Sequence, residues 1–242
     1  MQMTPAGKQL LLRAGAELGL NLEPHIPQFS TFFDMLSEAN QTTNLTAIRD
    51  EAGIILKHFV DSLTCLTYPG LVEGISVIDV GTGAGFPGLP LAIVQPSTQF
   101  DLLDATQKKT AFVARVIQTL GLRNARALWG RSEELAHQGV KRETYGAALT
   151  RAVASMATVA ELTLPLVQVG GFVLVQKGAE VEREVAAARG ALSKLGGQLE
   201  QIFHLKLPII GDARTLVVLR KIDPTPQQYP RKPGVPAKNP LS

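Results

Sequence analysis

From residue 75 onward, short β-branched segments alternate with amphipathic ones, and this rhythm constrains the fold more than any other feature. We expect strands over residues 75–80, 99–104, 125–129, 147–150 and 171–176, and helices over 87–94, 108–120, 132–138, 153–166 and 180–195. Such alternation is typical of a parallel, doubly wound α/β sheet with helices on both faces. Two further strands, 200–207 and 215–222, are joined only by residues 208–213. So short a link permits antiparallel pairing and no parallel crossover, so the sheet should have seven strands, be mostly parallel and end in an antiparallel hairpin.

The chain divides into three regions. Residues 1–70 carry apolar side chains at helical spacing, which predicts an N-terminal helical region packed on the core. Residues 71–222 form the predicted sheet domain. Six of the last 20 residues are proline, so we expect residues 223–242 to be extended or disordered unless a partner orders them.

Charge is distributed unevenly along the chain. The net charge of +3 equals that of residues 221–242 alone, while residues 1–104 hold 4 basic and 11 acidic side chains and residues 105–151 hold 9 and 3. A polyanion such as RNA would be attracted to the middle segment and the tail. The alternative is a solvated surface with uneven charge.

The sequence lacks a second cysteine, a secretory leader, a membrane span and a set of metal ligands, and these absences predict the compartment and the absence of a metal. A single cysteine, Cys65, precludes an internal disulfide and suits a reducing compartment. No secretory leader and no apolar run of about 20 residues is present, so we expect a soluble, cytoplasmic protein that does not contact membranes. No metal is expected, because no second histidine or cysteine lies at ligand spacing from His58.

Three alternating glycines, Gly81, Gly83 and Gly85, follow the first predicted strand. Glycine lets the backbone turn sharply and approach a ligand without an intervening Cβ. The helix that begins at Pro87 then offers free amides to a carboxylate or phosphate. The segment therefore predicts a ligand-binding turn.

Two cofactors compete for this turn. Residues 83–88 match the dinucleotide pattern G-x-G-x-x-G, which would suit a nicotinamide-dependent oxidoreductase. Counted from the first glycine after the strand, however, Phe86 occupies the place of the third glycine. An acid two residues ahead of Gly-x-Gly-x-Gly, here Asp79, resembles the first motif of S-adenosylmethionine-dependent methyltransferases, where it acts on the methionine part.

Acidic and polar residues follow the next two predicted strands. Asp104 lies 19 residues past Gly85, where a carboxylate meets ribose hydroxyls in either cofactor. Ser132 and Glu133 follow the third strand, where methyltransferases hold the adenine ring; the alternative is an ordinary helix N-cap with an acidic first turn.

The absence of two sequence motifs narrows the class of methyl acceptor. Methylating a pyrimidine carbon needs a cysteine nucleophile, and Cys65 lies in an apolar helix before the cofactor turn. The Pro-Pro-Tyr-like clamp of amine methyltransferases is absent after the fourth strand. Guanine N7 needs neither device, because its lone pair attacks in line and no proton must leave. Arg151 either orients a base or phosphate there or forms a structural ion pair.

These features together resemble the glucose-inhibited division protein B family, over nearly the whole chain. The shared motifs are Asn44-Leu45-Thr46, His58 with Asp61-Ser62, residues 79–88, Leu103-Asp104, Lys108-Lys109, Thr150-Arg151-Ala152, Leu164-Pro165, Lys177-Gly178, Arg220-Lys221, residues 231–234 and residues 238–241. The resemblance implies a class I methyltransferase fold and S-adenosylmethionine as donor. It also implies methylation of guanine N7 in the 530 loop of 16S ribosomal RNA, either free or in the small subunit.

The resemblance also implies site residues. The expected cofactor contacts are Gly81, Phe86, Asp104, Ala105, Thr106, Ser132, Glu133 and Arg151, joined by Asp79 and Gly83 from the glycine motif. Many relatives carry Asp-Ser where this chain has Asp104-Ala105-Thr106, which would alter a ribose contact. We expect Lys177, Arg231, Lys232 and Lys238 to contact RNA, Trp129 and His58 to fill core positions, and the protein to act as a monomer. A non-catalytic RNA-binding module is the remaining alternative.

Overall fold

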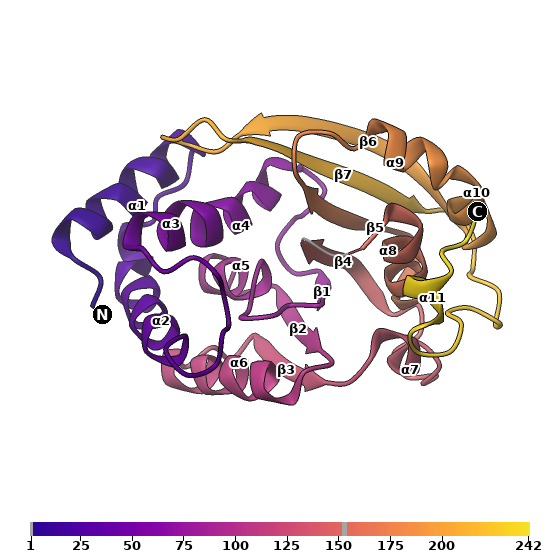
Figure 1. Cartoon of the computed structure of the whole chain (residues 1–242), viewed down its shortest axis with the longest axis horizontal. Helices are drawn as coiled ribbons and strands as arrows, with labels where there is room; N and C mark the ends of the chain where they lie inside the picture. Colours follow the sequence, from indigo (N-terminus) through magenta and orange to yellow (C-terminus); the bar gives the residue numbers. More distant parts are fainter. Residues whose placement is uncertain (1, 152–153) are drawn as a thin grey trace.

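The computed structural model describes residues 2–151 and 154–242 and contains one seven-stranded sheet (Figure 1). Its strands are β1 (Ser76–Val80), β2 (Gln99–Asp104), β3 (Ala125–Trp129), β4 (Tyr145–Arg151), β5 (Val167–Lys177), β6 (Gly197–Lys206) and β7 (Ala213–Lys221). The strand order is β3-β2-β1-β4-β5-β7-β6. Strands β1 to β5 pair in parallel, whereas β7 pairs antiparallel with both β5 and β6. The predicted fold class is confirmed.

Alternate residues of the strands face two separate cores, as the two-residue period of a strand requires. Val77 of β1 and Leu149 of β4 lie in one core, whereas Ile78 and Ala148 lie in the other. Helices α5 (Gly88–Val94) and α6 (Gln107–Leu120) contribute to the first core, and α8 (Met156–Thr163) contributes to the second. The sheet is therefore covered on both faces.

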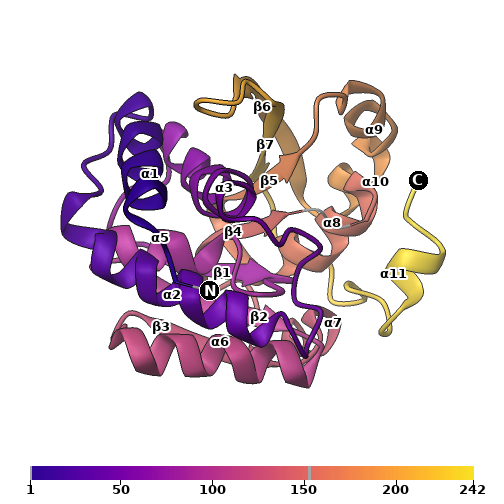
Figure 2. The ribbon, with the colours of Figure 1, turned by 60° about the vertical axis from the view of Figure 1, so that its left-hand side comes forward.

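The N-terminal region packs into the first core. Its helices are α1 (Pro5–Glu17), α2 (Ile26–Ala39) and a continuous segment from α3 (Glu51–Ile54) through a π-helical turn at 55–60 to α4 (Asp61–Leu63). Phe32 of α2 is fully buried and stacks on Phe86 at 5.3 Å between ring centroids. Figure 2 shows α2 lying beside α6. The helical segment that carries His58 and Asp61 contacts the same Phe86 through His58 and β5 through Gln176.

Two helix predictions differ from the structure. The expected helix 180–195 is divided at Ala188 into α9 (Glu182–Ala187) and α10 (Arg189–Lys194), and Val185 and Leu192 both lie in the second core. Helix α7 ends at Leu135 instead of 138. The expected start of α8 at Val153, and Ala152 of the shared motif, lie outside the described residues; α8 is capped by Ser155.

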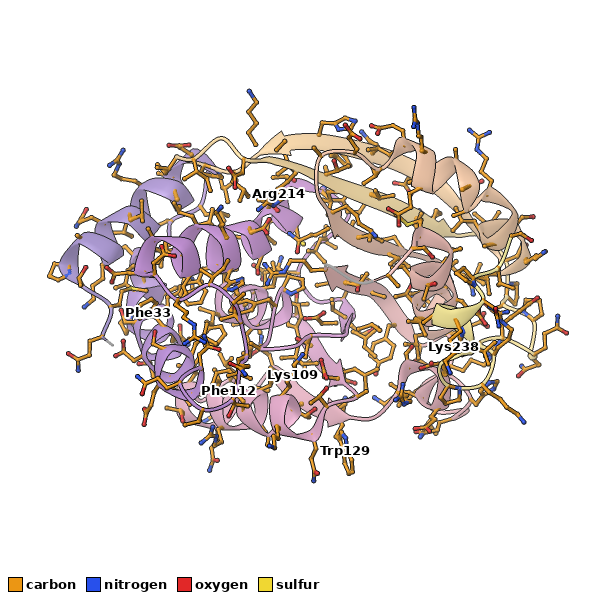
Figure 3. All side chains as sticks on the ribbon, in the orientation of Figure 1. Phe33, Lys109, Phe112, Trp129, Arg214 and Lys238 are labelled. Atoms are coloured by element: carbon orange, nitrogen blue, oxygen red, sulfur yellow. The ribbon has the colours of Figure 1, made fainter. Side chains whose placement is uncertain are left out.

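Trp129 was expected in the core, and that prediction is wrong. Its side chain is 63% exposed because it ends β3, the edge strand of the sheet (Figure 3). Its indole Nε1–H donates to the carbonyl of Ala105 at 3.2 Å. No helix of the described residues is long and apolar enough to cross a membrane.

The C-terminal tail was expected to be extended or disordered; most of it has no regular secondary structure, but it is packed on the domain. The tail contains the short helix α11 (Val235–Lys238) and lies along α7 and α8 (Figure 1). The prolines of the tail lack N–H groups, so a proline that packs on the domain needs a hydrogen-bond donor for its carbonyl but no acceptor. Those donors are present: Thr158 Oγ1 donates to the Pro236 carbonyl at 2.9 Å, and His137 Nε2 lies 2.8 Å from the Pro230 carbonyl. Side chains of the domain thus order the tail without a partner.

Candidate functional site

The carboxyl ends of β1, β2 and β3 form a pocket of about 200 Å³, called here the β1–β3 pocket. Its lining residues are Val80, Gly81, Leu103, Asp104, Ala105, Gly130, Arg131, Ser132, Glu133, Leu162, Gly234 and Ala237. Five of the expected cofactor residues are brought together here, namely Gly81, Asp104, Ala105, Ser132 and Glu133. Because carboxyl ends of parallel strands share one edge, residues 81 to 133 converge despite their separation.

The glycine turn and Asp104 support one another. Gly81 has φ +77° and Gly83 has φ +60°, in the left-handed region that favours glycine. The Gly83 N–H donates to Asp104 Oδ2 at 2.9 Å, and the Thr106 N–H donates to Oδ1 at 2.7 Å. Gly83 and Thr106 thus fix the carboxylate that lines the pocket.

Asp79 lies beneath the turn and is fully buried. Its Oδ2 accepts hydrogen bonds from Thr82 Oγ1 at 2.6 Å and from the Gly88 N–H at 2.8 Å. A Cβ on Gly88 would lie 2.1 Å from Leu102 Cδ2, so only glycine fits there. Asp79 Oδ1 has no hydrogen-bond partner among the described residues, and burial raises the pKa of this carboxyl to about 6. A buried acceptor of this kind fits a cationic or water-mediated ligand group.

The tail closes the β1–β3 pocket, a contact that sequence reasoning missed. Glu133 Oε1 accepts a hydrogen bond from the Gly234 N–H at 3.0 Å, and Gly234 and Ala237 line the pocket. Ser132 Oγ donates to the Leu162 carbonyl of α8. The Pro-Gly turn within residues 231–234 was a usable signal, since such turns are structural, but its basic neighbours pointed to RNA.

The carboxyl ends of β4 and β5 form a second pocket of about 350 Å³, called here the β4–β5 pocket. Its lining residues are Ile48, Lys57, His58, Asp61, Arg151, Gln176, Lys177, Gly178 and Arg214. The two pockets lie at the same sheet edge. One is formed at the ends of β1, β2 and β3 and the other at the ends of β4 and β5, and β1 and β4 are neighbours in the sheet. The strand order reverses there, which is where open α/β sheets bind ligands.

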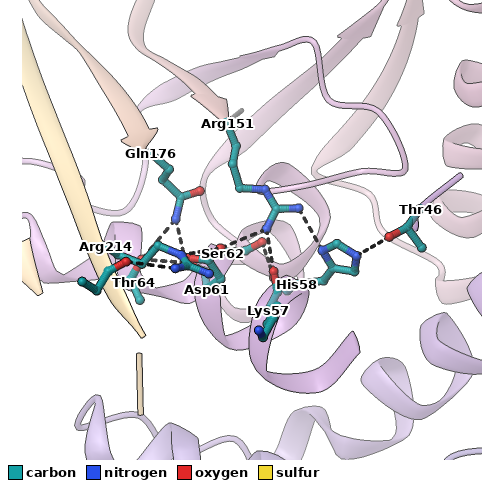
Figure 4. Close-up of polar contacts among 10 residues, drawn as sticks. Thr46, Lys57, His58, Asp61, Ser62, Thr64, Arg151, Gln176 and Arg214 are labelled. Atoms are coloured by element: carbon teal, nitrogen blue, oxygen red, sulfur yellow. Dashed lines mark hydrogen bonds and ion pairs between the residues drawn. The ribbon is translucent and has the colours of Figure 1, made fainter. Parts of the chain in front are cut away.

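Arg151 lies in the β4–β5 pocket and makes the ion pair that was its alternative role. Its Nη1 donates to the Lys57 carbonyl at 3.1 Å and lies 3.5 Å from Asp61 Oδ2 (Figure 4). Its guanidinium lies 5.0 Å from the Phe86 ring centroid. Phe86 is buried against Arg151 and His58 and lies outside the lining of the β1–β3 pocket. Arg151 and Phe86 therefore pack against each other next to the carboxyl end of β4, outside the lining of the β1–β3 pocket.

His58 is held as a neutral imidazole. It stacks on Phe86 with ring centroids 4.6 Å apart, and its Nε2 lies 2.7 Å from Thr46 Oγ1. Burial, reinforced by the charge of Arg151, lowers the pKa of His58 to about 3. Both ring nitrogens of His58 lie near a partner, as expected, but the side chain is half-buried and lines the β4–β5 pocket, so it does not fill a core position. Cys65 is fully buried, and burial raises the pKa of its thiol, so it is no nucleophile.

The four expected RNA contacts fall into two groups. Lys232 and Lys238 are exposed on the tail, and Lys238 is visible in Figure 3. Lys177 lines the β4–β5 pocket and donates to Glu184 Oε1 at 2.9 Å. Arg231 donates to both carboxylate oxygens of the fully buried Glu161, at 2.9 and 2.6 Å. Arg231 is therefore committed to holding the tail.

The mostly parallel seven-stranded sheet with its terminal antiparallel hairpin is the class I methyltransferase fold. Solved structures share this fold at low sequence identity. A SAM-dependent methyltransferase from Aquifex aeolicus has a TM-score of 0.55 and 18% identity over 74% of this chain and 98% of its own. M. jannaschii TYW2 in complex with AdoMet has a TM-score of 0.50 and 13% identity over 67% and 77%.

A family model described as rRNA small subunit methyltransferase G matches residues 25–216, and the chain belongs to this family. The Ribosomal RNA small subunit methyltransferase G of Pelotomaculum thermopropionicum is 47% identical over 95% of this chain and 97% of its own length. That of Deinococcus deserti is 45% identical over 99% and 98%. The predicted family, enzyme class and methyl donor are confirmed, and the nicotinamide alternative is set aside.

Proposed function

We propose that the protein transfers a methyl group from S-adenosylmethionine to N7 of a guanine in the 530 loop of 16S ribosomal RNA. The observation that carries this proposal is the pair of pockets at one sheet edge. One contains the glycine turn with Asp104 and Glu133, and the other opens beside Arg151 across β1 and β4. A donor in the first pocket and an acceptor base in the second would meet there.

The cofactor site fits its ligand through residues already in place. When bound, S-adenosylmethionine supplies an electrophilic methyl group on its sulfonium. Asp104 would accept hydrogen bonds from ribose hydroxyls, and Ser132 and Glu133 would flank the adenine. Gly81 leaves room for the backbone to approach the ligand. Asp79 is buried beneath the turn and outside the pocket lining, so its carboxylate would act on the methionine part through water or through its charge.

Positioning is the main catalytic device of this site. Guanine N7 attacks with its own lone pair, so no base is needed to remove a proton. The neutral His58 and the paired Arg151 suit this chemistry, because neither is available to accept a proton at neutral pH. The pockets would bring the two reacting atoms together and exclude water.

The RNA partner is proposed to engage basic side chains near the two pockets. Lys232 and Lys238 are exposed on the tail beside the β1–β3 pocket, whereas Lys177 lines the β4–β5 pocket as a part-buried side chain that pairs with Glu184. Arg231 is removed from the set of phosphate contacts, because Glu161 occupies its guanidinium. We propose that the protein acts on RNA in the cytoplasm as a monomer.

The function is tested by labelled methyl transfer. Purified protein with methyl-labelled S-adenosylmethionine should label small-subunit ribosomal RNA from a strain that lacks the enzyme. Cleavage specific for 7-methylguanosine should place the label in the 530 loop. Absence of label from both free RNA and small subunits, or label at another base, would overturn the proposal.

Cofactor affinity should rise with pH through the titration of Asp79. Its pKa in the folded protein is about 6. A cationic ligand favours the ionised form, so the dissociation constant should fall about tenfold between pH 5 and pH 7. The contribution of Asp79 to folding stability changes with pH in the opposite direction. Because its pKa in the folded protein lies above the unfolded value of 3.8, Asp79 favours the folded state below pH 3.8, and this contribution is lost as pH rises through about 6.

Calorimetric titration of the wild type, Asp79→Asn and Asp101→Asn checks this prediction. Asp79→Asn should bind more weakly and without the pH dependence. Asp101 lies on the neighbouring strand β2, and Lys141 and Tyr145 hydrogen-bond its carboxylate, whose pKa is lowered despite burial. Asp101→Asn should therefore keep the wild-type profile. A profile that persists in Asp79→Asn would assign the titration to another group.

A further inference from the structure

Two buried oxygens in the β4–β5 pocket have no hydrogen-bond partner among the described residues. They are Asp61 Oδ1 and Gln176 Oε1, on side chains from the α4 segment and from β5. Asp61 is 5% exposed and Gln176 is 4% exposed. Leaving a buried acceptor unsatisfied costs about 1–3 kcal/mol, so a pocket that contains two of them fits a ligand that donates twice.

The orientation of Gln176 is fixed by its own hydrogen bonds. Its Nε2 donates to the Asp61 carbonyl at 2.6 Å and to Thr64 Oγ1 at 3.1 Å. Both amide hydrogens are thereby used, which leaves Oε1 as an acceptor. Figure 4 shows Gln176 and Arg151 entering the cluster from neighbouring strands, with Asp61 between Arg151 and Arg214.

The carboxylate of Asp61 is only loosely neutralised. Oδ2 accepts long hydrogen bonds from Arg151 Nη1 at 3.5 Å and from Arg214 Nε at 3.4 Å, and Arg214 Nε lies 3.3 Å from Oδ1 without hydrogen-bond geometry. These distances exceed the 2.7–2.9 Å of a well-formed charged pair. Burial raises the pKa of Asp61 and the two arginines lower it, so desolvation is incompletely offset. A closer N–H donor would complete the shell of this carboxylate.

We propose that the β4–β5 pocket binds the acceptor guanine by its Watson–Crick edge, with Asp61 and Gln176 accepting from N1–H and the 2-amino group. The proposal rests on the function proposed above. Guanine carries N7 on the edge opposite the 2-amino group, so a base held by Asp61 and Gln176 would turn N7 toward β1 and the cofactor pocket. Adenine presents an acceptor at N1 and lacks the 2-amino group, so its 6-amino group is the one donor on this edge and at least one of the two oxygens would stay unpaired.

Single-turnover methylation of ribosomal RNA tests the proposal with three proteins and two substrates. The proteins are wild type, Asp61→Asn and the control Asp212→Asn. Asp212 is a half-exposed carboxylate that pairs with Lys57 near the pocket. The substrates carry guanosine or inosine at the target position, since inosine lacks only the 2-amino group. Melting temperature and S-adenosylmethionine affinity are measured for each protein.

Asp61→Asn should lower kcat/KM about 100-fold on the guanosine RNA with cofactor affinity retained, and Asp212→Asn should remain within about twofold of wild type. Wild type should lose about tenfold on inosine. Should Asp61→Asn fail to fold, the kcat/KM of Gln176→Met and the rate of wild type on inosine RNA test the same pocket assignment. Equal rates on guanosine and inosine, or an unchanged kcat/KM in Asp61→Asn, would overturn the pocket assignment while leaving methyl transfer intact. Absence of transfer by wild type would instead remove the proposed function itself.

Discussion

The Gly81→Arg protein is expected to lose S-adenosylmethionine binding and methyl transfer together. Gly81 has φ +77°, which a side chain tolerates only at a cost of about 1–2 kcal/mol. The larger effect is steric, because Gly81 lines the β1–β3 pocket and an arginine side chain there would occupy the space of the ligand. Calorimetric titration should detect no binding, and labelled transfer should fall to background.

A matched substitution separates strain from occlusion. Gly74 has φ +87°, and an added Cβ would meet no atom within 4 Å. Gly74→Arg therefore carries comparable backbone strain and the same added charge at a site remote from the pocket. It should be slightly less stable than wild type but bind the cofactor normally. Normal binding by Gly81→Arg would show that the pocket is wrongly assigned.

The Arg231→Ala protein is expected to be less stable by about 3–5 kcal/mol. Glu161 is fully buried on α8, and Arg231 supplies both a backbone N–H at 2.8 Å and the guanidinium bonds to its carboxylate. Removing the guanidinium leaves a buried charge without a counterion, which is the costly case for ion pairs. Because Gly234 lines the β1–β3 pocket three residues later, cofactor affinity should also fall. Thermal and urea unfolding, with cofactor titration, measure both effects.

Two further variants distinguish a structural tail from an RNA-binding one. The double variant Glu161→Leu with Arg231→Met removes both charges and should regain most of the stability. The double variant Lys232→Gln with Lys238→Gln should unfold like wild type but lower the salt slope of RNA binding by about 1.5. If Arg231→Ala lowered that salt slope without lowering the free energy of unfolding, the prediction would be wrong, and Arg231 would contact RNA instead of stabilising the tail through Glu161.

Local patterns determined much of the architecture. The strands Gln99–Asp104 and Ala125–Trp129 were predicted to the residue, because each is a short run with apolar side chains that follows a turn segment, residues 96–98 or 121–124. The hairpin that ends the sheet followed from the length of its link. The convergence of Gly81, Asp104, Ser132 and Glu133 in the β1–β3 pocket was predicted from their places after strands, since strand ends converge in a parallel sheet.

Only the tertiary structure decided how the tail and the β4 side of the site are used. A proline-rich basic segment has the composition of an RNA-binding tail, yet Glu161 and Glu133 turn it into a wall of the β1–β3 pocket. Likewise Phe86 packs on His58 and Arg151 rather than lining that pocket. These contacts join residues 28 to 101 positions apart, and their partners were set by packing of whole elements. Local periodicity and composition report the conformation of a segment; which distant side chain a buried charge meets is fixed when the elements assemble.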